Sequence, residues 1–182
     1  MNKLQLLKYI IIDVDGTMTD GGIYYDSYGN EIKKFCTKDA AGLFCLKAAG
    51  IQPLVVTGRR CFATERRMQD LRVEFLYQDV KDKKLFLEHF TKDYGVSAGE
   101  IGYLGDDLND YAAMSLCGFK ACPANACEEI KEISDYISAR TGGNGAVRDV
   151  AEHILKGRKQ WAEAIRSVYG VNDLHRMLGA GE

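Results

Sequence analysis

A short apolar run over residues 9–12 leads directly into the acidic segment Asp13-Val14-Asp15-Gly16-Thr17. A continuous apolar run is typical of a strand in a parallel sheet, because such a strand is covered on both faces. The two carboxylates that follow are costly to bury, since desolvation favours the neutral acid unless a cation lies nearby. The segment therefore predicts a buried strand over residues 8–14 that ends in a site with a chemical role.

Extended and helical patterns alternate along the rest of the chain. A β-hairpin is expected over residues 23–35, because two short extended runs flank a turn with Gly29 and Asn30. Further strands are expected over 51–56, 73–77, 101–104, 119–122 and 136–138. A first helix is expected from Asp39, as its N-cap, to about residue 49. A second follows Arg60 and ends at about 71, and a third covers 81–94. A fourth follows Asp110 and ends at about 116, and the last three cover 128–133, 147–155 and 161–168. The alternation predicts an α/β fold with a three-layer, doubly wound, Rossmann-like parallel sheet. We expect one domain over residues 1–156 and a helical tail over 157–182.

Size, charge and cysteine usage narrow the class of protein. The 182 residues suffice for one domain, and a net charge of −2 argues against a general nucleic-acid binder. No apolar run approaches the roughly 18 residues that cross a membrane, and the first residues lack the organisation of a signal peptide. The six cysteines form no Cys-x-x-Cys pair and are typical of core residues in a reduced protein. We expect a cytoplasmic protein with no nucleic-acid or membrane partner.

Unusual polar residues follow three of the predicted strands, and one more begins a helix. They are Asp13 and Asp15, then Thr57-Gly58-Arg59, then Lys83, and finally Asp106 with Asp107 and Asp110. Ligands of doubly wound sheets bind at the carboxyl ends of the strands, so these side chains are expected to converge. Each residue taken alone is explained as well by a helix cap, a turn or a solvated charge, but the ordered set favours a site.

The set suits phosphoryl transfer. Carboxylate oxygens from two strands can hold Mg²⁺, which accepts a phosphate oxygen as a further ligand. One aspartate can attack phosphorus and form an aspartyl-phosphate, while the other protonates the leaving alcohol and then activates water. A threonine hydroxyl and a lysine ammonium can hold the phosphate oxygens as charge develops.

These segments resemble the four motifs of the haloacid dehalogenase superfamily of phosphotransferases, and the likeness covers about residues 8–155. The resemblance implies that Asp13 is the nucleophile and a Mg²⁺ ligand. It implies that Asp15 is the general acid and base and gives its backbone carbonyl to the metal. Asp106 would be the third metal ligand.

The same resemblance gives roles to residues around the metal. Thr57 and Lys83 would bind the transferred phosphoryl group. Asp107 and Asp110 would orient the metal ligands and Lys83 without binding the metal themselves.

The spacing of the motifs leaves no room for a cap domain. About twenty residues separate Gly16 from the first predicted helix, and one helix and one strand separate Lys83 from Asp106. Several segments are similar to those of the 3-deoxy-D-manno-octulosonate 8-phosphate phosphatases, a capless subgroup: residues 20–25, 29–31, 34–35, 38–39, 57–59 and the glycine-rich loop 142–148. That resemblance implies a homotetramer in which the hairpin of one subunit borders the site of the next.

The substrate implied is a small-molecule sugar-acid phosphate. Arg59 follows Thr-Gly as in the octulosonate enzymes, and its guanidinium suits a bidentate contact with a carboxylate. Two departures from that subgroup are Asn144, in place of a common arginine, and Ala40-Ala41, in place of a bulkier pair. Besides Arg59, the residues expected on the substrate side are Asp15, Thr37, Lys38, Asp39, Gly58, Arg67 and Lys83.

Three other functions remain open from the sequence. The first is a phosphatase of a nine-carbon nonulosonate 9-phosphate. The second is a receiver-like phospho-acceptor, which Asp15 disfavours because a general base would shorten the life of the aspartyl-phosphate. The third is a non-catalytic oligomerisation domain, which the complete set of four motifs disfavours.

Overall fold

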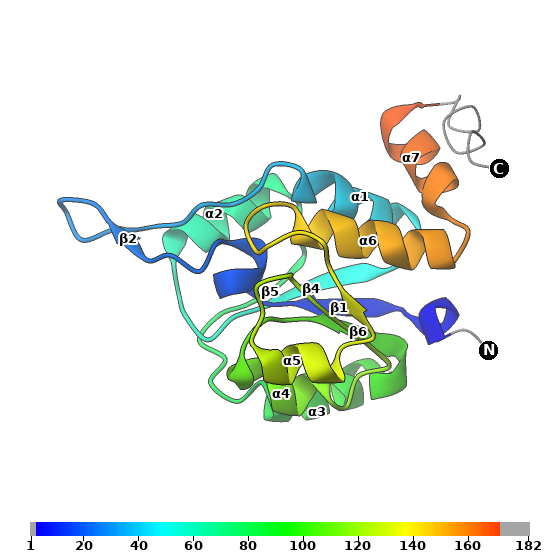
Figure 1. Cartoon of the computed structure of the whole chain (residues 1–182), viewed down its shortest axis with the longest axis horizontal. Helices are drawn as coiled ribbons and strands as arrows, with labels where there is room; N and C mark the ends of the chain where they lie inside the picture. Colours follow the sequence, from blue (N-terminus) through cyan, green and yellow to red (C-terminus); the bar gives the residue numbers. More distant parts are fainter. Residues whose placement is uncertain (1–2, 172–182) are drawn as a thin grey trace.

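The structure, a computed structural model, describes residues 3–171 and contains a sheet of six parallel strands (Figure 1). The strand order is β5-β4-β1-β6-β7-β8, so β1 lies inside the sheet with the chain winding outward on both sides of it. This arrangement confirms the predicted doubly wound α/β fold. The strands are β1 (Tyr9–Ile12), β4 (Gln52–Val56), β5 (Phe75–Tyr77), β6 (Ile101–Leu104), β7 (Phe119–Cys122) and β8 (Tyr136–Ile137).

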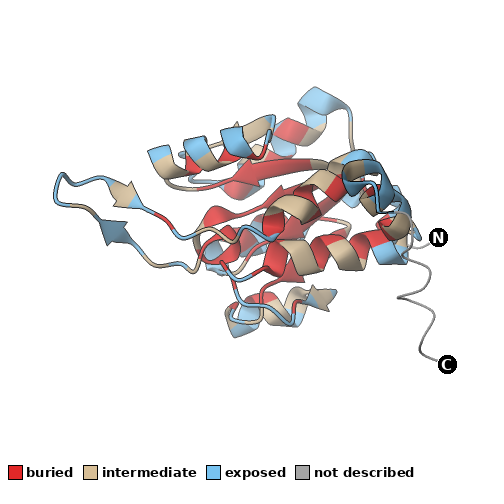
Figure 2. Cartoon of the chain, turned by 90° about the horizontal axis from the view of Figure 1, so that it is seen from above, coloured by how far each residue is buried: buried red, intermediate tan, exposed pale blue. Residues whose placement is uncertain are grey.

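Helices cover both faces of the sheet, and β1 shows why both faces are apolar. Ile10 and Ile12 enter one core layer and Ile11 enters the other, because successive side chains of a strand point to opposite faces. Buried residues accordingly run through the middle of the molecule in Figure 2. One layer holds α1 (Asp39–Ala48), α2 (Phe62–Asp70), α6 (Ala146–Gly157) and α7 (Trp161–Tyr169), and the other holds α3 (Lys83–Tyr94), α4 (Leu108–Met114) and α5 (Glu128–Ile133).

The predicted hairpin is present and projects from the body of the molecule (Figures 1 and 2). Its strands β2 (Tyr24–Tyr25) and β3 (Glu31–Ile32) are antiparallel and form a separate two-stranded sheet. Asp26 stabilises the turn, because its Oδ1 accepts hydrogen bonds from the backbone N–H groups of Tyr28 and Asn30, both at 2.8 Å. The hairpin exposes apolar side chains of Ile23, Tyr25, Tyr28 and Ile32.

Several predicted boundaries shift. β1 ends at Ile12, because the chain turns from Val14 onward, and α3 begins at Lys83 after Asp82, whose Oδ1 accepts a hydrogen bond from Leu85 N at 2.9 Å. The prediction that Asp39 caps α1 is wrong. Asp39 is the first residue of the helix, and its Oδ1 accepts instead from the backbone N–H of Arg148 at 2.9 Å.

The predicted tail helix is confirmed as α7, where Trp161 and Ala164 are buried in the layer that contains α1 and α6. Residues 172–182 of the predicted tail lie outside the described part, and the division of the chain at 156 stays a prediction. All six cysteines are free, and four of them are buried. Within residues 3–171, none of the helices has the length and apolarity that a bilayer span requires.

Candidate active site

The carboxyl ends of three adjacent strands bring the predicted motifs together. β1 pairs with β4 on one side and with β6 on the other, so the residues that follow these strands lie at one edge of the sheet. Asp13 follows β1, Thr57 follows β4, and Gly105-Asp106 follows β6. The sequence placed these residues at strand ends, and the strand order makes them neighbours.

The chain leaves β1 through a tight turn over Val14–Met18. Gly16 has a φ of 92°, a left-handed conformation that favours glycine. A Cβ at Gly16 would also lie 2.0 Å from Asp106 Oδ2, so a side chain there would displace the Asp106 carboxylate. Thr17 completes the contact, since its hydroxyl donates to Asp106 Oδ1 at 2.7 Å. The Gly-Thr pair of the first motif therefore positions the carboxylate of the fourth.

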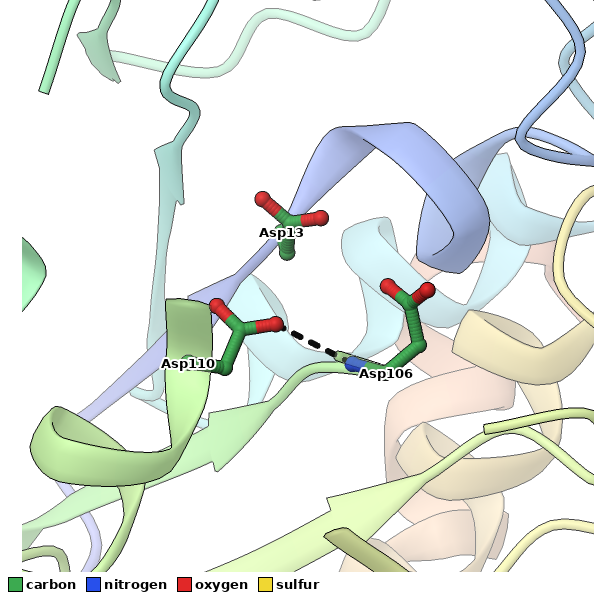
Figure 3. Close-up of side chains that lie close together, drawn as sticks. All are labelled: Asp13, Asp106 and Asp110. Atoms are coloured by element: carbon green, nitrogen blue, oxygen red, sulfur yellow. Dashed lines mark hydrogen bonds between the residues drawn. The ribbon is translucent and has the colours of Figure 1, made fainter. Parts of the chain in front are cut away.

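Three carboxylates meet at this edge. Oxygens of Asp13, Asp106 and Asp110 lie within 4.8 Å of one another (Figure 3). Burial raises the pKa of Asp13 well above its ordinary value, and the nearby Asp110 carboxylate raises it further. Burial likewise raises the pKa of Asp106 to about 6. A cation bound near Asp13 and Asp106 would favour their ionised forms.

Asp110 is already committed to contacts within the protein. Its Oδ1 accepts from Tyr103 Oη at 2.7 Å and from Lys83 Nζ at 2.6 Å, and its Oδ2 accepts from Asp106 N at 3.1 Å. The last contact is the dashed line in Figure 3. Asp13 and Asp106 are therefore the carboxylates best placed to hold a divalent cation, with Asp110 behind them. Their oxygen donors fit a hard cation such as Mg²⁺.

Lys83 is a buried cation that contacts the carboxylate cluster. It begins α3, and its Nζ lies 2.5 Å from Asp13 Oδ1 and 2.6 Å from Asp110 Oδ1. Burial disfavours the ammonium, but the Asp13 and Asp110 carboxylates together hold the pKa of Lys83 above its ordinary value. The lysine therefore remains charged between two carboxylates.

Asp15 has a different environment from Asp13. Its side chain is 27% exposed, whereas that of Asp13 is 5% exposed. Asp15 Oδ2 accepts a long hydrogen bond of 3.4 Å from Thr57 Oγ1, and Asp15 Oδ1 pairs with Lys33 Nζ. Asp13 and Asp15 thus differ in solvent access. Asp13 belongs to the buried cluster, whereas the more exposed Asp15 is suited to exchanging protons.

Lys33 and Glu31 are site residues that sequence reasoning missed. The Lys33 side chain is 1% exposed, and its Nζ contacts Asp15 and lies 2.8 Å from Glu31 Oε1. Glu31 Oε2 in turn accepts from Arg59 Nη2 at 2.7 Å. The hairpin was predicted, but nothing in its sequence distinguishes Lys33 from Lys34, whose side chain is 52% exposed.

The remaining residues predicted on the substrate side have contacts away from the three carboxylates. Asp39 bonds to the backbone of Arg148, and Arg67 Nη2 donates to Cys36 O at 3.4 Å. Gly58 O accepts from Lys81 Nζ. Thr37 and Lys38 are exposed, and Lys38 lines a cavity of about 460 Å³. The assignment of these residues to a substrate stays a prediction.

Asp107, Asn144 and Gly142, which the sequence also singled out, contact segments near the site. Asp107 is the N-cap of α4, because its Oδ1 accepts from Leu108 N at 2.8 Å, so the direct contact with Lys83 comes from Asp110. Asn144 joins the glycine-rich loop to the hairpin, since its Oδ1 accepts from Lys34 Nζ at 2.9 Å. Gly142 packs against the turn after β1, where a Cβ would lie 1.8 Å from Gly16 O.

Comparison with known proteins yields consistent matches. A family model of haloacid dehalogenase-like hydrolases matches residues 75–149. The 3-deoxy-D-manno-octulosonate 8-phosphate phosphatase KdsC of Haemophilus influenzae is 35% identical over 86% of this chain and 87% of its own length. That of Escherichia coli K12 is 31% identical over 89% and 86%.

Solved structures give the same picture. The phosphatase of this name from Moraxella catarrhalis, solved with a magnesium ion, a phosphate ion and KDO, superposes with a TM-score of 0.87 at 39% identity, over 91% of this chain and 95% of its own. The cobalt-bound enzyme from Haemophilus influenzae superposes with a TM-score of 0.83 at 34% identity, over 88% and 94%.

Proposed function

The chain belongs to the haloacid dehalogenase-like hydrolases, and on that premise we propose that it is a Mg²⁺-dependent phosphatase of 3-deoxy-D-manno-octulosonate 8-phosphate. The observation that carries this proposal is the meeting of Asp13, Lys83 and Asp106 at one edge of the sheet. It combines a nucleophile, a cation for phosphate oxygens and a second metal ligand. The substrate is suggested by the relatives, whose names specify this sugar phosphate.

In the first step, an Asp13 carboxylate oxygen attacks phosphorus and the bond from phosphorus to the sugar oxygen breaks. Asp15 gives its proton to the departing sugar oxygen, which leaves as the alcohol. The product on the enzyme is an aspartyl-phosphate at Asp13. The half-buried position of Asp15 supports this division of labour, because a proton donor must reach both the leaving group and water.

In the second step, Asp15 takes a proton from water, and the water oxygen attacks phosphorus. The bond from phosphorus to Asp13 breaks, the carboxylate is regenerated and inorganic phosphate leaves. Thr57 and Lys83 hold the phosphoryl oxygens in both steps, since their donors lie beside Asp15 and Asp13 respectively.

A bound Mg²⁺ would reduce the repulsion between the Asp13 carboxylate and the phosphate dianion. The Asp13 and Asp106 carboxylates and the backbone carbonyl of Asp15 would hold it. The raised pKa values of Asp13 and Asp106 support this assignment, because burial disfavours both carboxylates and a bound cation would offset that cost.

The decisive experiment compares kcat/KM for eight-carbon and nine-carbon keto-deoxy sugar-acid phosphates in the presence of Mg²⁺. The proposal requires a clear preference for 3-deoxy-D-manno-octulosonate 8-phosphate. A preference for a nonulosonate 9-phosphate would retain the phosphatase and replace the substrate. Arg59→Ala should raise KM for the preferred sugar-acid phosphate more than for p-nitrophenyl phosphate, and equal effects would remove Arg59 from substrate recognition.

The projecting hairpin supports a homo-oligomer, and by resemblance a tetramer. Its exposed side chains, among them Ile23 and Tyr28, form an apolar surface that a second copy of the chain can cover. Sedimentation equilibrium measures the assembly directly. Tyr28 is 90% exposed, so its replacement should not disturb the fold. A Tyr28→Lys variant should shift the protein toward smaller species.

A further inference from the structure

Arg59, the residue proposed to recognise the sugar-acid carboxylate, already holds a carboxylate of the protein itself. Its Nη2 lies 2.7 Å from Glu31 Oε2, at the start of the returning strand of the hairpin. The guanidinium bonds Glu31 through this one nitrogen. Its Nε is buried and has no hydrogen-bond partner among residues 3–171. A carboxylate that engaged Arg59 through two nitrogens would satisfy an atom that Glu31 leaves unpaired.

Glu31 is itself shared between two cations. Its Oε1 lies 2.8 Å from the buried Lys33 Nζ, and its side chain is 14% exposed, whereas that of Arg59 is 41% exposed. The hydrogen bond from Arg59 keeps the pKa of Glu31 below its ordinary value, so Glu31 is an anion at neutral pH. If Arg59 turned to another anion, Glu31 would keep its contact with Lys33. Its charge would therefore stay compensated.

We infer, resting on the proposed function, that Glu31 is a specificity-determining residue: it occupies Arg59 in the free protein and gives way to the carboxylate of a sugar-acid phosphate. The exchange replaces one anion by another at Arg59, so it leaves no buried charge unpaired. A sugar phosphate without a carboxylate carries no second anion for Arg59, because its phosphate is held by Thr57 and Lys83, and it leaves Arg59 on Glu31. The Glu31–Arg59 ion pair thus lowers the affinity for sugar-acid phosphates, because their carboxylate must displace Glu31 from Arg59.

The consequence is a selective effect of neutralising Glu31. In Glu31→Gln, the amide retains the size of the side chain but competes for Arg59 without charge. Sugar phosphates with a carboxylate should therefore bind more tightly, while sugar phosphates without one should not. Glu31→Gln can also change the contact of Lys33 with Asp15. Such a change affects both kinds of ligand equally, so it cancels in the ratio of their dissociation constants.

The probes are 6-phosphogluconate and glucose 6-phosphate, two six-carbon sugar phosphates of which only the first carries a carboxylate. Their dissociation constants are measured by calorimetry with Mg²⁺, in full-length protein carrying Asp13→Asn so that neither ligand is turned over. Glu31→Gln should lower the constant for 6-phosphogluconate by about threefold to fivefold, the range expected for release of a partly exposed ion pair. The constant for glucose 6-phosphate should change by less than this.

Two controls make the test specific. Asp79→Asn removes a carboxylate from the exposed ion pair of the neighbouring Arg60, in which Arg60 Nε lies 2.8 Å from Asp79 Oδ2. This variant should leave the ratio of the two dissociation constants unchanged. In an Arg59→Ala background, Glu31→Gln should have no selective effect. Equal shifts for both ligands, a selective effect that persists without Arg59, or the same effect from Asp79→Asn would each overturn the inference. Failure to hydrolyse the octulosonate phosphate would instead overturn the proposed function, because neither probe is that compound.

Discussion

Lys83 Nζ lies 2.5 Å from Asp13 Oδ1, although 70 positions separate the two residues and both are buried. The contact joins the start of α3 to the end of β1 and is reinforced by Asp110 on the other side of the lysine. A buried ion pair of this kind is costly to break, because the partner left behind keeps its charge without compensation. The proposed phosphate-binding cation is therefore also a structural element.

Lys83→Met should impair both stability and activity. The substitution leaves Asp13 and Asp110 facing each other, so the free energy of unfolding should fall by about 3–5 kcal/mol. Turnover should fall at least about a hundredfold, since a cation that stabilises the transition state is lost. Urea unfolding and steady-state kinetics measure the two effects. Lys84→Met is the matched control, because Lys84 is the exposed next residue of α3 and should tolerate the change. Wild-type stability in Lys83→Met would contradict a structural role for the ion pair.

Asp13→Asn should abolish phosphatase turnover and leave the fold intact. The amide oxygen can still accept a hydrogen bond from Lys83, but it cannot attack phosphorus. Turnover of p-nitrophenyl phosphate and circular dichroism give the comparison. Asp26→Asn on the exposed hairpin turn controls for loss of a carboxylate elsewhere. Undiminished turnover in Asp13→Asn would refute the nucleophile assignment.

Mg²⁺ affinity should depend on pH. Burial raises the pKa of Asp106 to about 6 and that of Asp13 well above its ordinary value, so protons compete with the metal in acid. Below about pH 6 the affinity should fall by about tenfold for each pH unit and each displaced proton. Above the pKa values it should level off. Calorimetric titrations between pH 5 and 8, in buffers of different ionisation enthalpy, report both the affinity and the protons released. Equal affinity at all pH values would argue against these ligands.

Asp39→Asn should stabilise the protein at neutral pH. Burial raises the pKa of Asp39 from 3.8 to about 6, so the folded state holds this proton more tightly than the unfolded state. Stability due to this group is therefore lost as pH rises from about 4 to about 6 and stays lost above that range. Asparagine does not titrate, and it can still accept from Arg148 N. The gain at pH 7.5 should be about 1–3 kcal/mol and should vanish near pH 4, as measured by urea unfolding in EDTA. A gain of equal size at both pH values would reject burial of charge as its cause.

Gly142→Ala should disturb the site through a neighbouring loop. A Cβ at Gly142 would lie 1.8 Å from Gly16 O, a backbone atom of the turn that positions Asp106 through Thr17. The two loops must separate, and a misplacement of about 1 Å can lower kcat by about a hundredfold. Gly99→Ala is the control, since its Cβ would meet only Ser97 Oγ at 3.7 Å. Normal kcat in Gly142→Ala would show that this contact does not support the site.

The apolar run before Asp13 and the order of the motifs were sufficient to predict the α/β sheet and the residues at its carboxyl edge. Strand periodicity and turn residues are local properties, so they can be read without knowing which segments meet. The order of the strands was not predicted: the structure places β1 between β4 and β6, and this order brings Asp13, Thr57 and Asp106 together.

Local pattern was insufficient where a side chain finds its partner across the fold. Lys33 and Lys34 are adjacent and chemically identical, yet Lys33 is buried against Asp15 and Glu31 while Lys34 is exposed beside Asn144. Asp39 has the sequence of a helix cap but bonds to Arg148 on a helix more than a hundred positions away.

The sequence by itself thus determined the fold class and the chemistry available at the end of β1. Only the tertiary structure decided which residue compensates each charge. Lys83 compensates Asp13, and Glu31 compensates Arg59. The physical reason is that the cost of a charge depends on its burial and its partners. Both are set by segments that approach one another only after the chain has folded.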